Sequence, residues 1–264
     1  MSFFSADHIS AGYGKEHVIS DVTFQTEAGS LTGIVGANGS GKTTLLKALC
    51  GILPHEGTCR LDGEVLEGKS ARKMAQLCSY IPQRSGISID ISALDVVLMG
   101  FNSRLGLLEH PTAAMRQAAA DALARTGLAG KEQTNYLHLS EGQKQLCILA
   151  RTLVADSKLL LLDEPESALD FRFRYQMLSL LREWVAADRR AGVVSLHDPA
   201  LALNFCDRLL LLGEGGLLGI AEPRRDPIDK TEQMLSMVYG KISLQRCRTR
   251  GGAEQLVMLR EDEE

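Results

Sequence analysis

The chain has 264 residues, of which 45% are hydrophobic and 23% charged, so it is long enough to bury a sizeable core. These fractions are near the averages of globular proteins and exclude a wholly disordered or collagen-like chain. The formal net charge of −4 lacks the strong positive field of a general nucleic-acid binder.

The sequence shows no membrane-spanning or export pattern. Its longest aliphatic runs, residues 159–162 and 209–212, are far shorter than the roughly 20 apolar residues of a membrane helix. The N-terminal segment lacks a basic start followed by an apolar stretch. The six cysteines are scattered singly and match neither a zinc-binding pattern nor a disulfide framework. We therefore expect a soluble cytosolic protein with reduced, buried thiols.

The first part of the chain alternates strand and turn patterns. Strands are predicted at residues 3–9, 18–26 and 31–35, with turns at 12–14 and 28–30. A glycine-rich turn follows the third strand, and a helix is predicted over residues 43–50. A strand, a glycine loop and a helix in this order open a parallel α/β unit.

The middle of the chain has a helical pattern, from about residue 91 to 155, with residues 113–125 dense in good helix formers. Alternation of strands and helices then returns, with elements predicted at 159–162, 172–189, 193–196, 199–205 and 209–212. We therefore predict an α/β core interrupted by a helical insertion. The last 25 residues predict a small β-hairpin, with strands at 242–247 and 255–259 and a turn at 251–252.

Residues 36–43, GANGSGKT, fit the phosphate-loop pattern G-x-x-x-x-G-K-[ST] at every fixed position. Glycines let the backbone curl so that successive N–H groups point into one concavity, and the following helix adds its positive end. Lys42 would reach the β- and γ-phosphates, and the hydroxyl of Thr43 would ligate Mg²⁺. An accidental match in a chain of this composition has odds of about one in a hundred, so we predict nucleotide binding.

Two acids, Asp163 and Glu164, follow the apolar strand at residues 159–162. An unbroken aliphatic strand is buried on both faces, and parallel sheets bind ligands at the carboxyl ends of their strands. Asp163 is therefore expected to hold Mg²⁺ beside the phosphates, directly or through water, and Glu164 to polarise an attacking water. Taken alone, the two acids could instead form a solvated loop; the phosphate loop upstream favours the catalytic interpretation.

Two further segments are LSEGQ, at residues 139–143, and PESALD, at residues 165–170. With the phosphate loop, in matching order over roughly residues 3–222, they resemble the ATPase subunits of ATP-binding cassette (ABC) transporters. The resemblance implies a P-loop NTPase (RecA-like) α/β core with an antiparallel β subdomain and a helical insertion. It implies four parts: residues 1–87 (β subdomain and phosphate loop), 88–155 (helical subdomain), 156–225 (second part of the core) and 226–264 (C-terminal extension).

In that family, the signature segment of one subunit closes over ATP held by the phosphate loop of another. The resemblance implies a homodimer in which Ser140 and the backbone N–H of Gly142 donate hydrogen bonds to the ATP that is held by the partner subunit. The same residues also fit an ordinary helix cap, because Ser140 followed three residues later by Gln143 is a capping box. Glu141 stands where the family has its first signature glycine, and an acid there would repel the γ-phosphate unless it points away.

Four other residues gain a role only from the resemblance. His197 matches the switch histidine that contacts the γ-phosphate, and Gln83 matches the glutamine that senses Mg²⁺ and the attacking water. Tyr13 matches the aromatic residue that stacks on adenine, and Asp170 the acid at the end of a dimer-contact loop. Outside this context, a lone histidine after a strand or an aromatic residue in a turn is more often structural. Glu166 stands where many relatives have Thr or Ser, a minor departure.

The resemblance thus implies three groups of site residues, with ATP and Mg²⁺ as cofactors. The catalytic group is Glu164, as general base, with His197, Gln83 and Lys42. The Mg²⁺ ligands are Thr43, Gln83 and Asp163. The ATP-binding group is Tyr13, Gly36, Asn38, Gly39, Ser40, Gly41, Lys42, Thr43, Thr44, Ser140, Gly142, Gln143 and Asp170.

The resemblance also implies partners, because no membrane-spanning segment is predicted in this chain. We expect two separate transmembrane permease subunits that dock near Gln83 and the helical insertion. The chain would lie peripherally on the cytoplasmic face of the plasma (inner) membrane, and a periplasmic or surface solute-binding protein would act indirectly. The resemblance to ATPases of iron-siderophore, haem and cobalamin importers lies in residues 95–100, 105–108, 197–203 and 206–208 and in a C-terminal segment that continues beyond residue 240. It favours uptake of metal chelates, and no nucleic-acid partner is expected.

Several alternatives stay open at this point. The chain could serve an exporter, or it could be an ABC ATPase that acts on DNA or ribosomes. The short spacing between Lys42 and Ser140 excludes a long coiled-coil insertion, and one cassette per chain disfavours a translation factor. A P-loop kinase or small GTPase does not explain residues 139–143, and a binding module without catalysis does not explain why every catalytic position holds a competent residue.

Overall fold

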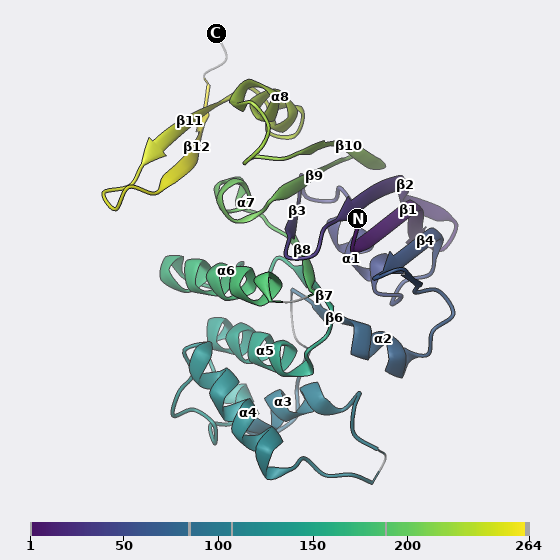
Figure 1. Ribbon diagram of the computed structural model, residues 1–264, viewed down its shortest axis with the longest axis vertical. Coiled ribbons are helices and arrows are strands. Elements are labelled where there is room, and N and C mark those ends of the chain that lie inside the picture. Colours follow the sequence, from purple (N-terminus) through teal and green to yellow (C-terminus); the bar gives the residue numbers. More distant parts are fainter. Residues whose placement is uncertain (1, 84–85, 107, 188, 262–264) are drawn as a thin grey trace.

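The computed structural model describes residues 2–83, 86–106, 108–187 and 189–261. A six-stranded sheet with the order β10-β9-β3-β8-β7-β6 forms the centre of the molecule (Figure 1). Its inner pairs are parallel, and β10 pairs with β9 in the antiparallel direction. The strands are β3 (Leu31–Gly36), β6 (Cys78–Ile81), β7 (Leu159–Asp163), β8 (Ala191–Ser195), β9 (Arg208–Gly213) and β10 (Gly216–Ala221).

Alternate residues of β7 face two different hydrophobic cores. Leu160 and Leu162 pack in the core that contains helix α6 (Phe171–Ala186) and the helices within residues 93–155. Leu159 and Leu161 pack with helix α1 (Lys42–Leu49) and the N-terminal strands. All four side chains are fully buried. The unbroken aliphatic run therefore reflects a parallel strand covered on both faces, as predicted.

A four-stranded antiparallel sheet, β2-β1-β4-β5, covers one side of the molecule. It contains β1 (Phe4–Tyr13), β2 (Glu16–Thr26), β4 (His55–Leu61) and β5 (Glu64–Val65). Helix α1 (Lys42–Leu49) packs between β1 and the central sheet. The turn predicted at residues 12–14 is wrong in part, because Gly12 and Tyr13 pair with β2 and the strand ends only there. Strands β4 and β5 had no counterpart in the sequence analysis.

The helical layer consists of α3 (Ala93–Leu98), α4 (Ala113–Arg125) and α5 (Glu141–Ala155), which pack against one another (Figure 1). Two short 3₁₀ turns, Met99–Phe101 and Tyr136–His138, belong to the same region. These elements fall within residues 88–155, while the four domain limits themselves stay predictions. A short helix, α2 (Ala71–Leu77), precedes β6 and was not predicted. The P-loop NTPase fold with a β subdomain and a helical insertion is confirmed.

The remaining elements complete the sheet and extend beyond it. They are α6 (Phe171–Ala186), α7 (Pro199–Phe205), α8 (Ile228–Tyr239), β11 (Ile242–Arg248) and β12 (Glu254–Arg260). Strands β11 and β12 form the predicted C-terminal hairpin, with α8 beside it (Figure 1). The helix predicted over residues 172–189 is wrong at its end, because α6 stops at Ala186; residue 188 lies outside the described residues, as do Leu107 and the last three acids. No helix within the described ranges has both the length and the apolar character needed to cross a membrane.

Because β7 is buried on both faces, truncation of one of its side chains should strongly destabilise the protein. We expect Leu161→Ala to lower the free energy of unfolding by about 2–5 kcal/mol, because truncation leaves a cavity between the sheet and α1. Urea denaturation followed by circular dichroism measures the change. The matched control is Leu108→Ala, since Leu108 is 89% exposed and its truncation should change stability by less than about 0.5 kcal/mol. Equal effects of the two substitutions would contradict this account of the core.

Candidate active site

The loop between β3 and α1 has a backbone that only glycine permits at key positions. A Cβ on Gly36 would lie 2.5 Å from the carbonyl oxygen of Leu212 on the adjacent strand. Gly41, the N-terminal cap of α1, has a φ of +93°, and a Cβ there would lie 2.4 Å from the side chain of Ile19. The loop therefore curls tightly between neighbouring elements and directs the N-terminus of α1 toward a cleft.

Lys42 lies at the first turn of α1 with its side chain folded back along this loop. Its Nζ donates to the carbonyl oxygens of Gly36, at 2.9 Å, and Ala37, at 3.2 Å. The same ammonium lies 3.7 Å from Oε1 of Glu164 and is almost fully buried. The Lys42 ammonium is thus held against the phosphate loop and close to Glu164.

Asp163, the last residue of β7, is buried, and three hydroxyl groups surround its carboxylate. The hydroxyl of Thr43 donates to Oδ2 at 2.8 Å, and that of Ser195 donates to Oδ1 at 2.9 Å. The hydroxyl of Tyr80 lies 3.4 Å from Oδ2. Burial, with the nearby Asp163 carboxylate, raises the pKa of Tyr80, so its hydroxyl stays protonated as a donor. The predicted Mg²⁺ ligands Thr43 and Asp163 therefore lie together.

Glu164 follows in a left-handed conformation, with a φ of 43°. Its backbone N–H donates to the Ser195 hydroxyl at 2.9 Å, which fixes this turn at the sheet edge. The side chain then accepts a hydrogen bond at Oε2 from Nε2 of Gln83, at 2.9 Å, while Oε1 faces Lys42. Three of the four predicted catalytic residues are thus in direct contact, although they come from widely separated parts of the sequence.

Gln83 is itself held by a residue that the sequence analysis missed. Gln145, on α5 and buried, donates from Nε2 to the backbone oxygen of Gln83 at 2.7 Å. The bond joins the segment after β6 to the helix that begins at the signature segment. The sequence contains one signal for this role, a polar residue on an otherwise apolar face of the predicted helix. It could not identify Gln83 as the partner of Gln145, because that contact depends on tertiary packing.

A second missed residue is Glu166, whose carboxyl group lies beneath His197. Oε1 accepts the backbone N–H of His197 at 2.8 Å, and Oε2 is buried without a hydrogen-bond partner among the described residues. Burial raises the pKa of the Glu166 carboxyl, opposed by the hydrogen bond from His197. Glu166 therefore holds the backbone at His197 in place. The sequence did not indicate this role, because Glu166 stands in a polar segment that is typical of exposed loops.

Many of these groups line one cleft of about 720 Å³ at the carboxyl ends of the parallel strands, although the predicted site residues Gly36 and Asp163 are not among its lining residues in the described part of the chain. Tyr13, about half exposed at the end of β1, forms part of the rim. Most of the predicted site residues contribute to the lining, and Arg174 of α6 is an additional, unpredicted cation. The lining includes Tyr13, Asn38, Gly39, Ser40, Gly41, Lys42, Thr43, Thr44, Gln83, Glu164, Glu166, Arg174 and His197.

The signature residues and Asp170 are not among the residues that line this cleft in the described part of the chain. Ser140 caps α5 in a complete capping box with Gln143, at 3.3 and 3.1 Å. The side chain of Glu141 turns to Lys144, at 2.7 Å, and is largely exposed. Asp170 caps α6 by accepting the N–H of Phe173 at 3.0 Å. Within one chain, Ser140 and Gln143 therefore form the capping box that the sequence predicted, and Asp170 forms a helix cap that it did not predict.

Comparison with known families agrees with this geometry. A model of the family described as "ABC transporter" matches residues 19–167, which is more than half of the chain. The hemin import ATP-binding protein HmuV of Ruegeria sp. (strain TM1040) is 37% identical over 244 residues, covering 89% of this chain and 90% of that protein. HmuV of Vibrio parahaemolyticus is 35% identical over 245 residues, covering 91% and 92% of the two chains.

Solved structures extend the comparison to the fold. A chain from a metal-chelate type ABC transporter in an inward-facing conformation superposes with a TM-score of 0.81 at 25% identity, covering 98% of both chains. A dimeric ATP-binding cassette bound to ADP and phosphate has a TM-score of 0.75 at 22% identity, covering 84% of this chain and all of that one. The chain therefore belongs to the ATP-binding subunits of ABC transporters and is an ATPase of that family.

Proposed function

We propose that this ATPase powers an importer of haem or a related metal chelate, such as an iron-siderophore or cobalamin-type compound. The observation that carries the enzymatic part is the contact of Lys42, Gln83 and Glu164 beside the Thr43–Asp163 pair. The cargo class rests on the relatives, since those with high coverage are named as hemin import ATP-binding proteins.

The donor set fits the proposed Mg²⁺ ion. The Thr43 hydroxyl and the Asp163 carboxylate already meet at 2.8 Å, and both offer the oxygen atoms that Mg²⁺ prefers. Gln83 would complete the protein ligands through its side-chain amide. When bound, Mg²⁺ would neutralise charge on the β- and γ-phosphates of ATP.

In the proposed reaction, water attacks the γ-phosphorus in line with the bond to the ADP oxygen, which breaks as ADP leaves. Glu164 accepts the proton of the water, while Gln83 and His197 orient the reactants. Lys42 moves from the carbonyl oxygens of its loop to the phosphate oxygens, where its charge is closest to the developing negative charge. Glu166 supports this step by holding the backbone of His197.

Ser140, Gly142, Gln143 and Asp170 would act in a homodimer, each subunit completing the nucleotide site of the other. Ser140 and Asp170 are exposed at the N-termini of α5 and α6, and Gly142 and Gln143 are half-buried in the first turn of α5. These positions support the proposal, because backbone N–H groups at a helix N-terminus can face a γ-phosphate of the partner. The turn of Glu141 toward Lys144 keeps its carboxylate charge compensated and beside its own helix.

The proposed membrane partners are two separate permease subunits, docked near Gln83 and the helical layer on the cytoplasmic face of the membrane. The bond between Gln145 and Gln83 connects the helical layer to Glu164 through Gln83, which suits a docking site there. A solute-binding protein on the opposite side would deliver the cargo without touching this chain.

Removal of the proposed base should separate binding from turnover. We expect Glu164→Gln to reduce ATP hydrolysis by about 10²–10⁴-fold and to retain ATP binding, because the phosphate-binding groups survive. Phosphate release and equilibrium binding measure the two properties. Glu183→Gln, on an exposed side chain of α6, is the control and should hydrolyse ATP normally. A wild-type rate for Glu164→Gln would rule out this assignment.

Binding and dimerisation should also separate. In the Glu164→Gln background, Lys42→Ala should weaken ATP binding at least about tenfold. Ser140→Arg should leave the binding of ATP by the monomer unchanged but abolish the ATP-dependent dimer. Calorimetry and light scattering provide the readouts. Thr112→Arg removes a comparable cap, on α4, and should leave dimerisation intact. The trans arrangement is wrong if Ser140→Arg dimerises normally, or if it loses nucleotide binding as Lys42→Ala does.

The cargo proposal predicts a coupled activity. A complex of this chain with its permease in lipid vesicles should hydrolyse ATP faster when haem-loaded binding protein is added on the opposite side. The Glu164→Gln complex is the control and should not respond. Co-purification of ribosomes or DNA instead of a membrane protein would contradict a transport role, and stimulation by a chelate other than haem would contradict that cargo alone.

A further inference from the structure

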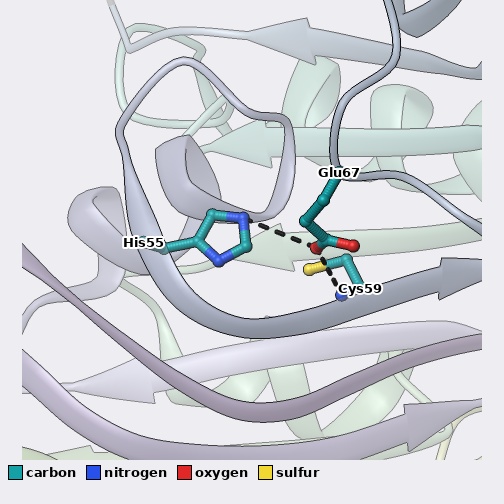
Figure 2. Close-up of side chains that lie close together, drawn as sticks. All are labelled: His55, Cys59 and Glu67. Atoms are coloured by element: carbon teal, nitrogen blue, oxygen red, sulfur yellow. Dashed lines mark hydrogen bonds and ion pairs between the residues drawn. The ribbon is translucent and has the colours of Figure 1, made fainter.

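A second cluster of reactive side chains lies outside the nucleotide cleft. His55 and Cys59 lie on β4, and Glu67 follows the short strand β5. One potential ligand atom from each residue lies within 4.8 Å of the other two. Figure 2 shows the imidazole of His55 pointing toward the carboxylate of Glu67, with the sulfur of Cys59 beside that carboxylate. Nitrogen, sulfur and oxygen donors therefore converge at one point of the β subdomain.

The backbone of the β subdomain builds this convergence. Gly57 has a φ of +89° within an irregular part of β4, and a Cβ there would lie 2.4 Å from a backbone oxygen of β1. Beyond it, the chain turns back so that the N–H of Leu66 donates to the carbonyl oxygen of Cys59 at 2.9 Å. The N–H of Cys59 in turn donates to Oε1 of Glu67 at 2.6 Å. The carboxylate is thus fixed beside the thiol.

The hydrogen bond of His55 leaves one ring nitrogen directed at the cluster. Nδ1 lies 3.1 Å from the carbonyl oxygen of Glu56, which can only accept, so Nδ1 carries a proton. In the neutral ring, Nε2 then presents a lone pair, and it lies 3.7 Å from Oε1 of Glu67. A lone pair and a carboxylate oxygen repel across such a gap unless a proton or a metal cation lies between them. Donation from the other ring nitrogen to a carbonyl is also how proteins orient metal-binding imidazoles.

We propose that His55, Cys59 and Glu67 bind one divalent cation of the Zn²⁺ class. In a tetrahedral zinc site, ligand atoms lie about 3.3–3.6 Å apart. Nε2 of His55 and Oε1 of Glu67 are 3.7 Å apart, and all three ligand atoms lie within 4.8 Å of one another. A donor set containing sulfur and nitrogen favours Zn²⁺ over Mg²⁺, which prefers oxygen alone. Binding replaces the thiol proton of Cys59 by a Zn–S bond and releases that proton to solvent.

The surroundings suit a bound cation with one open position. The cluster borders a cavity of about 570 Å³ between α1, β4 and α2, where water can supply the fourth ligand. Cys59 is buried, whereas the side chains of His55 and Glu67 are 9% and 34% exposed, which leaves a path for the ion. The C-terminal end of α1 at Leu49 borders the same cavity, and the negative end of the helix dipole favours a cation.

Cobalt(II) spectroscopy of the full-length protein in excess Mg²⁺ tests the site, because a thiolate–Co²⁺ charge-transfer band requires a cysteine ligand. Excess Mg²⁺ would compete with Co²⁺ for the oxygen ligands of the nucleotide cleft, and the band itself reports only on Co²⁺ bound to a cysteine. We expect wild-type protein to bind one equivalent of Co²⁺ with this band, and one equivalent of Zn²⁺ to displace it. Cys59→Ser should abolish the band, and His55→Gln should weaken Co²⁺ binding at least about tenfold.

Cys147→Ser is the matched control for loss of a buried thiol. The thiol of Cys147 donates to the carbonyl oxygen of Ala93 in the helical layer, which a serine hydroxyl can also do, so this variant should retain the band. Glu67→Gln, at a partly exposed side chain, should weaken Co²⁺ binding with an unchanged circular dichroism spectrum. The proposal is overturned if wild-type protein gives no band, as expected of a simple His55–Glu67 ion pair, or if Cys59→Ser retains it.

Discussion

The hydrogen bond between Thr43 and Asp163 joins the two halves of the nucleotide site. Thr43 belongs to the helix after the phosphate loop, and Asp163 ends a strand more than a hundred residues later. A buried carboxylate is costly unless it is paired, and here the hydroxyls of Thr43 and Ser195 supply its partners. The parallel register that pairs Asp163 with Ser195 brings these groups to one edge. Fold stability and the geometry of the cleft therefore depend on the same contacts.

The features that sequence could predict are those governed by local chemistry. The glycines of the phosphate loop, the aliphatic run of β7 and the capping box at Ser140 each encode their conformation within a few residues. The structure accordingly has a P-loop core, two acids at the end of β7 and a capped signature helix. Their assignment to one family came from the order of several motifs, because the phosphate loop alone is shared with other nucleotide-binding proteins and the segment at residues 139–143 is not explained by them.

The features that sequence could not predict depend on partners from distant segments. Gln145 and Glu166 each look like an ordinary polar residue until packing buries them against Gln83 and His197. Strand β4 begins at His55 and contains Gly57, which interrupts the strand pattern. The cysteine pattern suggested isolated thiols, yet the hairpin after β4 brings Glu67 to Cys59. A spacing rule based on sequence alone cannot detect donors that a bulge and a hairpin bring together.

The bond from Gln145 to Gln83 has a mechanical consequence. Its acceptor is a main-chain oxygen, whereas the side chain of the same Gln83 holds Glu164. A rigid-body tilt of α5 relative to the central sheet therefore displaces the glutamine as a whole and shifts the carboxylate with it. The linkage is only two hydrogen bonds long, so a displacement of α5 would reach the Glu164 carboxylate directly through Gln83. Gln83 therefore couples the position of α5 to the orientation of the Glu164 side chain.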